Sequence, residues 1–409
     1  MKKIIIASAL LLSIAGQAMA QGRTRDIDET YRRSSLYSLL ISHSDTKFHN
    51  EIEQCFQEIP TPDTYNDHDL SVKVISVDEK LTPEVVKRKE TPKGNAAIND
   101  FLERNKIASR LVAKWYDYDP LTGKMDVDLI GARGIYAASE IEKAKAATNV
   151  RGMETVLADA GEDLIQNTFV LVNDITYIDK SKGSKAVGSV FKILGAVAAA
   201  YTNDRSYMNL GQSLGDIAET FKGFSVRVHT SLYQLVWTEE EQANFYNTAW
   251  NNKDAFERMR GSFKLKYIGD QMSSGSNTSF LGIREDQPEH MVRKACQRAL
   301  DDNIANLQKN FQTFQIKSPL DVETMEARIG KKEGITMNSV FEVLERVKDA
   351  NGKVTYKKVG EVKPVQNLIW DNRYMAEEEM AEGATLGCTT FKKVSGGDFT
   401  PGCLIRQIK

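Results

Sequence analysis

The feature that most constrains the fold is a change in sequence pattern near Pro319. Before this residue, amphipathic segments of helical period alternate with apolar segments of strand period. After it, short segments of strand period are separated by glycine-containing turns. Residues 341–347 and 354–362, for example, flank Asp349-Ala350-Asn351-Gly352, which is a strong β-hairpin signal. We therefore expect an α+β protein with a small β-barrel domain over residues 320–409.

The part before Pro319 is expected to form an α/β domain over residues 69–319, preceded by an N-terminal helical segment over residues 21–68. Its clearest helix is 96–116, whose apolar residues recur every three or four positions. The other main expected elements are helices 28–41 and 289–314 and strands 70–77, 125–129, 169–178, 224–237 and 263–268. Thr238 and Glu241 have the spacing of a capping box, which predicts a helix start.

The first twenty residues have the pattern of a secretory signal peptide. Lys2 and Lys3 precede an apolar run over residues 4–15, and Ala18-Met19-Ala20 is a small-x-small cleavage site before Gln21. The run is too short for a stable membrane span, and no cysteine follows the cleavage site to carry a lipid. We therefore expect a periplasmic or secreted protein, cleaved near Ala20/Gln21, with no transmembrane span in the mature chain.

Composition argues against nucleic acid as a partner. The chain has 54 basic and 56 acidic residues and a formal net charge of −2, so it lacks the excess of Lys and Arg on which nucleic-acid binding relies. Its 409 residues exceed what one hydrophobic core usually supports, and 41% of them are apolar. Two or three packed domains are therefore expected.

The cysteines are Cys55, Cys296, Cys388 and Cys403. Export makes disulfides chemically accessible, and four cysteines allow three pairings. Cys388 and Cys403 lie in one β-rich stretch and are the preferred pair, since closing such a loop would stabilise the fold by roughly 3 kcal/mol. The alternative is four buried free thiols, because the domains are large enough to fold without cross-links.

A pair of helices over residues 185–222 is expected as an insertion in the α/β domain. The first helix carries an apolar stripe that includes Phe191, Leu194, Val197 and Tyr201. This stripe either packs on the domain's own sheet or docks on another protein or a membrane surface. Its four residues are the candidate partner-binding residues.

Gly211-Gln212-Ser213-Leu214-Gly215 matches the GxSxG pattern of a hydrolase nucleophile elbow. That chemistry needs a strand that delivers Ser213, a helix that follows it, and a histidine base such as His229 or His290. Apolar residues at helical spacing run through the motif, however, and favour a helix face of small residues. Ser213 is therefore a weak catalytic candidate.

Asp117, Asp119, Asp126 and Asp128 surround one turn and are the candidate calcium ligands. The EF-hand spacing fails because Leu121 occupies the third ligand position, so a solvated acidic turn is the preferred interpretation. The histidines form no HExxH or other metal-ligand spacing, and the chain has neither a P-loop nor a dinucleotide fingerprint. No cofactor and no coherent catalytic set are expected.

The order of elements resembles the CsgG-like family, whose α/β fold is shared by the N-terminal domain of TolB and the middle domain of the flagellar protein FlgT. The resemblance rests on residues 159–163, which lead into 168–174, and on residues 224–239. Residues 329–343 look like a segment of the SH3-like barrel that follows this fold in FlgT. The resemblance implies a CsgG-like α/β sandwich with the inserted helical pair, followed by an SH3-like barrel. It implies binding or scaffolding, with no catalytic residues to transfer.

Together these features favour an exported, non-enzymatic protein that binds or scaffolds other cell-envelope proteins, with peripheral membrane contact as a further option. The first alternative is a secreted serine hydrolase that uses Ser213. A third interpretation is a surface module stabilised by calcium.

Overall fold

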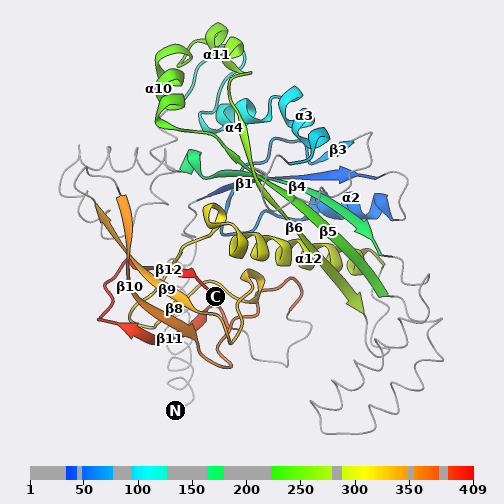
Figure 1. Cartoon of the computed structure of the whole chain (residues 1–409). Helices are drawn as coiled ribbons and strands as arrows, with labels where there is room; N and C mark the ends of the chain where they lie inside the picture. Colours follow the sequence, from blue (N-terminus) through cyan, green and yellow to red (C-terminus); the bar gives the residue numbers. More distant parts are fainter. Residues whose placement is uncertain are drawn as a thin grey trace, which may run out of the picture.

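The computed structural model describes residues 34–43, 48–76, 94–126, 164–178, 223–278, 288–348, 354–376 and 386–409. Within these ranges the protein is a mixed α+β structure built on two sheets, joined by one long helix that lies between them (Figure 1). The first sheet belongs to the part of the chain before Pro319, and the second belongs to the part after it. No helix in the described ranges is both long enough and apolar enough to cross a membrane.

The first sheet has the order β2-β1-β4-β5-β6, and β3 also pairs with β1. Its strands are β1 (Ser35–Ser42), β2 (Asn66–Asp67), β3 (Val74–Ser76), β4 (Thr168–Tyr177), β5 (Gly223–Leu235) and β6 (Leu265–Thr278). β1 is parallel to β2, β3 and β4, whereas β4, β5 and β6 are joined by antiparallel pairs. Because two antiparallel pairs separate them, β6 runs in the same direction as β4 and ends at the same side of the sheet.

The expected helix over residues 28–41 is wrong for the residues that the structure describes, because Ser35–Ser42 is the central strand β1. Five apolar residues of this strand are at most 2% exposed, namely Leu36, Tyr37, Leu39, Leu40 and Ile41. A strand buried on both faces has a continuous apolar run, which its period alone cannot distinguish from a buried helix. Residues 34–43 therefore belong to the α/β layer and not to a separate N-terminal helical segment.

Helices cover both faces of the first sheet (Figure 1). One face carries α3 (Ala96–Arg104) and α4 (Ile107–Trp115), and the other carries α2 (His49–Glu58) and α12 (Pro288–Asn310). The single helix expected over residues 96–116 is therefore two helices. The break is at Lys106, which adopts a left-handed conformation with φ of 51°.

Two short helices, α10 (Glu239–Thr248) and α11 (Lys253–Met259), close one end of the sheet. The predicted capping box is confirmed, since Thr238 N donates to Glu241 Oε2 at 2.9 Å and Glu241 N donates to Thr238 Oγ1 at 3.4 Å. Phe245 of α10 stacks on Tyr116 with ring centroids 5.0 Å apart, so these helices enclose an aromatic core.

The contact between α12 and the sheet is close because two glycines of β6 face the helix region. A Cβ added at Gly275 would lie 2.4 Å from the carbonyl oxygen of Ala295, and one at Gly269 would lie 2.2 Å from the Phe311 ring. A buried polar network completes the contact: Asn303 donates to Thr230, and Thr230 donates to Asn173 at 2.7 Å. These contacts hold α12 in one position on the sheet.

The second sheet is antiparallel and curls into a nearly closed, barrel-like structure (Figure 1). Its order is β7-β12-β9-β10-β11-β8, with strands β7 (Ser318–Pro319), β8 (Glu326–Ala327), β9 (Phe341–Lys348), β10 (Val354–Pro364), β11 (Thr389–Gly396) and β12 (Leu404–Gln407). β9 and β10 confirm the predicted hairpin. Two short 3-10 helices, η2 (Gln312–Phe314) and η3 (Lys331–Glu333), lie near the junction with α12.

Candidate functional site

A groove of about 660 Å³ lies along the outer edge of β6. Its lining includes the consecutive residues 263–268, together with Leu102 and Glu103 of α3 on one side and Thr313 of η2 on the other. Side chains of a strand alternate between the two faces of a sheet, so consecutive residues can line one groove only if the backbone edge faces it. Among the described strands β6 pairs with β5 alone. Within the part of the chain that the structure describes, the groove therefore exposes an unpaired strand edge.

The register identifies the backbone groups that this edge presents. Val236 N donates to the carbonyl oxygen of Lys264 at 3.0 Å, so Lys264 directs its hydrogen-bonding groups toward β5. In an antiparallel pair these groups alternate in direction from one residue to the next. Leu265 and Tyr267, which lie opposite Leu235 and Tyr233, therefore direct their N–H and C=O groups into the groove.

The rim of the groove carries an excess of positive charge. Lys106, Arg260, Lys264 and Lys266 line it, against the single carboxylate of Glu103. Lys264 Nζ lies 3.4 Å from Glu103 Oε1, and Arg260 pairs with Glu257. Burial would raise the pKa of Glu257, but Arg260 lowers it, and the charge of Lys106 adds a smaller lowering effect. The side chains of Lys106 and Lys266 are both exposed, so they can meet an anionic ligand.

Two tyrosines line the groove beside α3. Tyr233 Oη donates to Asn99 Oδ1 at 2.7 Å, and the ring of Tyr233 meets that of Tyr267 edge to face at 5.4 Å. Burial raises the pKa of Tyr233, so its hydroxyl stays protonated. Gly94, at φ +68°, leaves room for both tyrosines, because a Cβ there would lie 2.9 Å from Tyr233 Oη and 2.9 Å from Tyr267 Cδ2. This side of the groove is therefore rigid, with apolar ring faces and satisfied hydroxyls.

A row of histidines and aspartates continues from Tyr267 along the sheet. Tyr267 Oη donates to Asp270 Oδ1 at 2.7 Å, and Asp270 Oδ2 lies 2.8 Å from His229 Nε2. His229 is directly opposite Asp174 in the β4–β5 register, and Asp174 lies 2.8 Å from His43 Nε2. The hydrogen bond from His229 is the main cause that lowers the pKa of Asp270.

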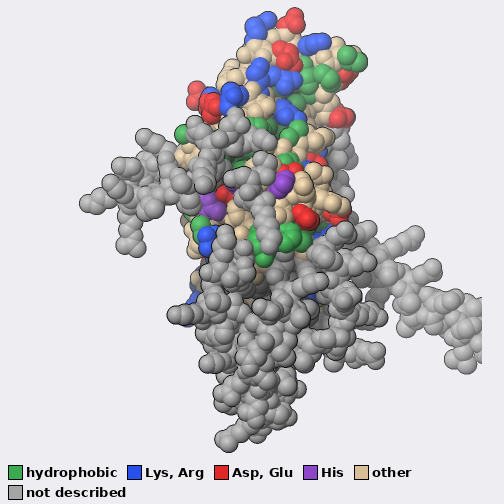
Figure 2. Space-filling view, turned by 90° about the vertical axis from the view of Figure 1, so that its right-hand side faces the viewer, with side chains coloured by type: hydrophobic (Ala, Val, Ile, Leu, Met, Phe, Trp, Pro, Cys, Tyr) green, Lys and Arg blue, Asp and Glu red, His purple; other side chains and the backbone are tan. Residues whose placement is uncertain are grey.

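This row lies toward the side of the molecule at which β1 and β4 end. Figure 2 shows that side, where histidine side chains (purple) reach the surface between acidic and hydrophobic ones. A His–Asp pair can move a proton, but it needs a nucleophile or a bound water to act on. Within the described residues, no three His, Cys, Asp or Glu side chains come together as a group that could hold a metal ion.

The structure leaves two of the predicted sites outside its described residues. The partner-binding stripe of Phe191, Leu194, Val197 and Tyr201 lies there, and so does Ser213. Of the two histidines proposed as its base, His229 is paired with Asp270. The side chain of His290 is not described.

Three of the four candidate calcium ligands lie in the described turn, and Asp128 lies outside it. Asp119 accepts hydrogen bonds from Leu121 N at 2.8 Å and from Thr122 Oγ1 at 2.5 Å, and the bond from Thr122 lowers its pKa. Its carboxylate therefore holds the turn together. Asp117 and Asp126 belong to no described group that could hold a metal ion.

The expected disulfide between Cys388 and Cys403 is absent, because all four cysteines are free thiols. The sequence places the two residues in one β-rich stretch, but β11 and β12, which follow them, are separated by β9 and β10 in the sheet. Cys388 interacts with Glu326 of β8, and burial raises the pKa of its thiol to about 11. Cys403 is buried in the core of the second sheet.

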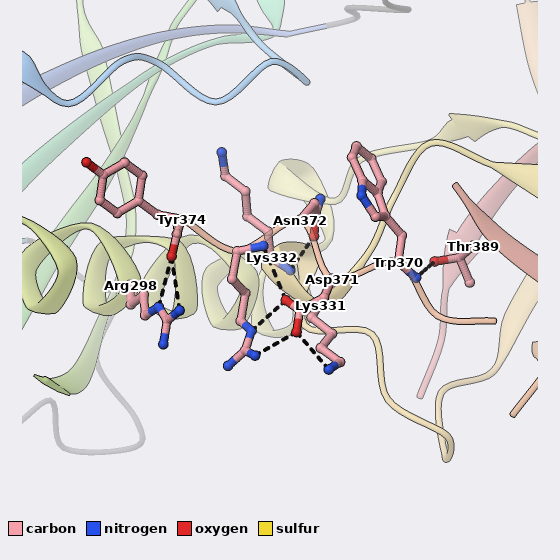
Figure 3. Close-up of polar contacts among 9 residues, drawn as sticks. Arg298, Lys331, Lys332, Trp370, Asp371, Asn372, Tyr374 and Thr389 are labelled. Atoms are coloured by element: carbon pink, nitrogen blue, oxygen red, sulfur yellow. Dashed lines mark hydrogen bonds and ion pairs between the residues drawn. The ribbon is translucent and has the colours of Figure 1, made fainter. Parts of the chain in front are cut away.

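The junction between α12 and the second sheet is a network of polar contacts (Figure 3). Arg298 donates to the carbonyl oxygen of Tyr374 at 3.0 Å, and Asn372 Oδ1 accepts from Lys332 N at 2.8 Å. Asp371 binds Arg373 at 2.7 Å and Lys331 at 2.8 Å. Burial would raise the pKa of Asp371, but hydrogen bonds from these two cations hold it well below its usual range. The network joins α12 to the second sheet through the bond from Arg298, and the charges of Asp371, Arg373 and Lys331 are paired with one another.

The groove was not predicted, although the strand that forms it was expected over residues 263–268. The basic residues Lys264 and Lys266 alternate along that strand, which indicates one solvated face. Only the strand order shows that the same segment is an edge. The position of Lys106 opposite this edge also depends on the break between α3 and α4.

Comparison with known proteins adds no family to this description: no protein-family model matches the chain, and no curated protein matches it. The chemistry of the groove is therefore inferred from its own residues.

Proposed function

We propose that this chain is an exported, non-enzymatic protein of the cell envelope that binds an extended, acidic segment of another envelope protein in the groove along β6. The observation that carries the proposal is the unpaired edge of β6, with Lys106 and Lys266 on its rim. A peptide that adds to a sheet edge gains main-chain hydrogen bonds, and charge on the rim selects its composition. The predicted signal peptide supports export, with cleavage near Ala20/Gln21.

The proposal extends to the finer fold. An α/β layer followed by a barrel-like antiparallel sheet has the architecture expected of a CsgG-like domain with an SH3-like barrel after it. An experimental structure of the mature chain tests this assignment, because the two domains would superimpose on those folds with the same strand order. A different strand order would contradict it.

The groove is tested with a fluorescein-labelled peptide of about ten alternating glutamate and valine residues, whose binding is followed by fluorescence anisotropy. We expect Lys106→Glu combined with Lys266→Glu to weaken binding by about tenfold, because each reversal removes an attraction and adds a repulsion. Lys392→Glu, an exposed lysine of β11, is the matched control and should leave the affinity unchanged. If the double variant and Lys392→Glu lose the same affinity for the peptide, the result would contradict binding in this groove.

Main-chain pairing is tested by N-methylation of the peptide. N-methyl groups on one set of alternate residues remove the donors that face β6, whereas those on the other set point to solvent. We expect one methylated peptide to lose binding and the other to retain it. If both bind as well as the parent peptide, the segment does not add to the strand edge.

One observation favours a second candidate, a secreted serine hydrolase. The pair of His229 and Asp270, 2.8 Å apart, is the arrangement that orients a general base. This candidate requires Ser213 as the nucleophile. It predicts that a fluorophosphonate probe labels the wild-type chain and does not label Ser213→Ala. If the wild-type chain is not labelled, the hydrolase candidate is excluded.

A further inference from the structure

A second pocket, of about 440 Å³, lies between the loop before β2 and the second sheet. Thr64 lines it from the loop, and Arg328, Lys332 and most of residues 370–376 line it from the chain around the second sheet. No residue of this pocket lines the groove along β6. Its volume and its place between two parts of the fold are typical of small-molecule sites.

Three polar groups in this pocket make no hydrogen bond with a described residue, namely the Thr64 hydroxyl, the Lys332 ammonium group and the indole N–H of Trp370. Lys332 Nζ lies 4.0 Å from Asp301 Oδ1, which is too long for a hydrogen bond. The side chains of Lys332 and Trp370 extend on one side of the chain in Figure 3, whereas that of Lys331 extends on the other. The pocket therefore offers three donors to the oxygen atoms of a ligand.

The charges around the pocket favour a ligand with a single negative group. The lining has as many acidic as basic residues, namely Asp63, Glu333 and Asp371 against Arg328, Lys332 and Arg373. Arg373 is held by two hydrogen bonds to Asp371, at 2.8 and 2.7 Å, and Glu333 accepts from Asn372 Nδ2 at 2.8 Å. A dianion would meet the acidic residues as well, and like charges repel. Lys332 is therefore the partner for one carboxylate.

The rest of the lining includes a flat apolar surface, the half-buried indole ring of Trp370. A sugar ring has C–H groups on its faces and hydroxyls around its rim, so it can cover the indole ring while its hydroxyls reach the indole N–H and Thr64. An aromatic acid would cover the same ring but would leave these two polar groups without a partner. The combination of ring surface and donors therefore favours a saccharide.

We propose that this pocket binds a sugar acid, a saccharide ring that carries one carboxylate, with the carboxylate at Lys332 and the ring face on Trp370. The ligand is held by one charged contact, two hydrogen bonds and one stacked ring, so its affinity is modest. The pocket shares no residue with the groove, and its ligand is independent of the peptide proposed there.

Calorimetric titration of the full chain with D-galacturonate tests the site. We expect a Kd of about 1 mM. D-galactose, which lacks the carboxylate, and benzoate, which lacks the hydroxyls, should each bind about tenfold more weakly. No binding of galacturonate at about 50 mM would overturn the proposal, and so would equal binding of galactose or benzoate.

The same titration with trigalacturonate distinguishes a polysaccharide from a free sugar as the source of this chemistry. Tighter binding of the trisaccharide than of the monosaccharide supports the site and identifies a polysaccharide, whose neighbouring rings extend past the pocket. Weaker binding of the trisaccharide supports the site and identifies a free sugar acid, because the chain ends do not fit.

Variants locate the binding in this pocket. We expect Lys332→Met and Trp370→Leu each to weaken galacturonate binding by about tenfold, since one removes the charge and the other the ring. Thr64→Val keeps the shape of the side chain and should weaken binding by about threefold. The matched control is Lys331→Met, because Lys331 pairs with Asp371 and does not line the pocket.

Melting temperatures show which variants are folded, and Thr64→Val tests the site even if a variant of the second sheet fails to fold. Unchanged affinity in the folded variants of Thr64, Lys332 and Trp370 would overturn the proposal. A loss in Lys331→Met as large as that in Lys332→Met would also overturn it, because the effect would then be one of general charge.

Discussion

Asp301 of α12 lies where this helix passes from the first sheet to the second. Its Oδ2 atom is buried and has no hydrogen-bond partner among the described residues, and its Oδ1 atom is 4.0 Å from Lys332 Nζ. Burial raises the pKa of Asp301 to about 7, since Lys332 compensates only part of the cost of removing the charge from water. The residue is therefore a source of pH dependence inside the fold.

The sign of this dependence follows from the two pKa values. The folded pKa, about 7, lies above the usual pKa of 3.8 of an aspartate in an unfolded chain, so the folded state binds the proton more tightly. The stabilisation from the neutral carboxyl is complete below pH 4 and is lost as the pH rises to about 7. The loss is on the order of 2 to 4 kcal/mol.

Asp301→Asn should separate this effect from other pH effects, because an amide resembles the neutral carboxyl and does not titrate. We expect the variant to be more stable than the wild type at pH 8, by about 2 kcal/mol, and similar to it at pH 4.5. Urea unfolding at the two pH values measures the difference. The control is Asp100→Asn, an exposed residue paired with Arg104, which should change stability by less than about 1 kcal/mol. A pH-independent effect of Asp301→Asn would contradict the assignment.

At the scale of elements, the sequence pattern predicted secondary structure most reliably for segments that have one buried face. The hairpin of β9 and β10 and the capping box before α10 were predicted and confirmed, because turn and cap signals are local. β1 was taken for a helix because both of its faces are buried, which removes the alternation typical of a half-buried strand. The break between α3 and α4 was missed because Lys106 is an ordinary helix former in a left-handed conformation.

The contact between β6 and α12 leads to a prediction at this scale. Gly275→Ala would place a Cβ 2.4 Å from the carbonyl oxygen of Ala295, and this backbone atom cannot rotate away as a side chain could. We expect a loss of about 2 kcal/mol in the free energy of unfolding, measured with urea. Gly261→Ala is the matched control, because nothing lies within 4 Å of its added Cβ, and it should change stability by less than about 0.5 kcal/mol. Equal stability of the two variants would show that α12 shifts freely on the sheet.

At the scale of the whole molecule, α12 is the element that both sheets share. It packs on β5 and β6 on one side, on α2 on another, and on the polar junction around Asn372 and Tyr374 (Figure 3). Docking against so many neighbours buries polar residues as well as apolar ones, namely Lys294, Gln297, Asp301, Asn303 and Gln308. The amphipathic pattern of residues 289–314 predicted the helix and its apolar stripe, but it could not show that the polar side is covered too.

The sequence by itself determined the division near Pro319, the α+β class and most of the segments that form strands and helices, because hydrophobic period and turn chemistry act over a few residues. Its first twenty residues also predict a signal peptide. Only the tertiary structure decided which strand is an edge among the described residues and which carboxyl group is buried away from water. Each of these depends on the order of strands in the sheet and on packing between residues far apart in the chain. The groove along β6 is therefore a property of the assembled sheet, and no local pattern encodes it.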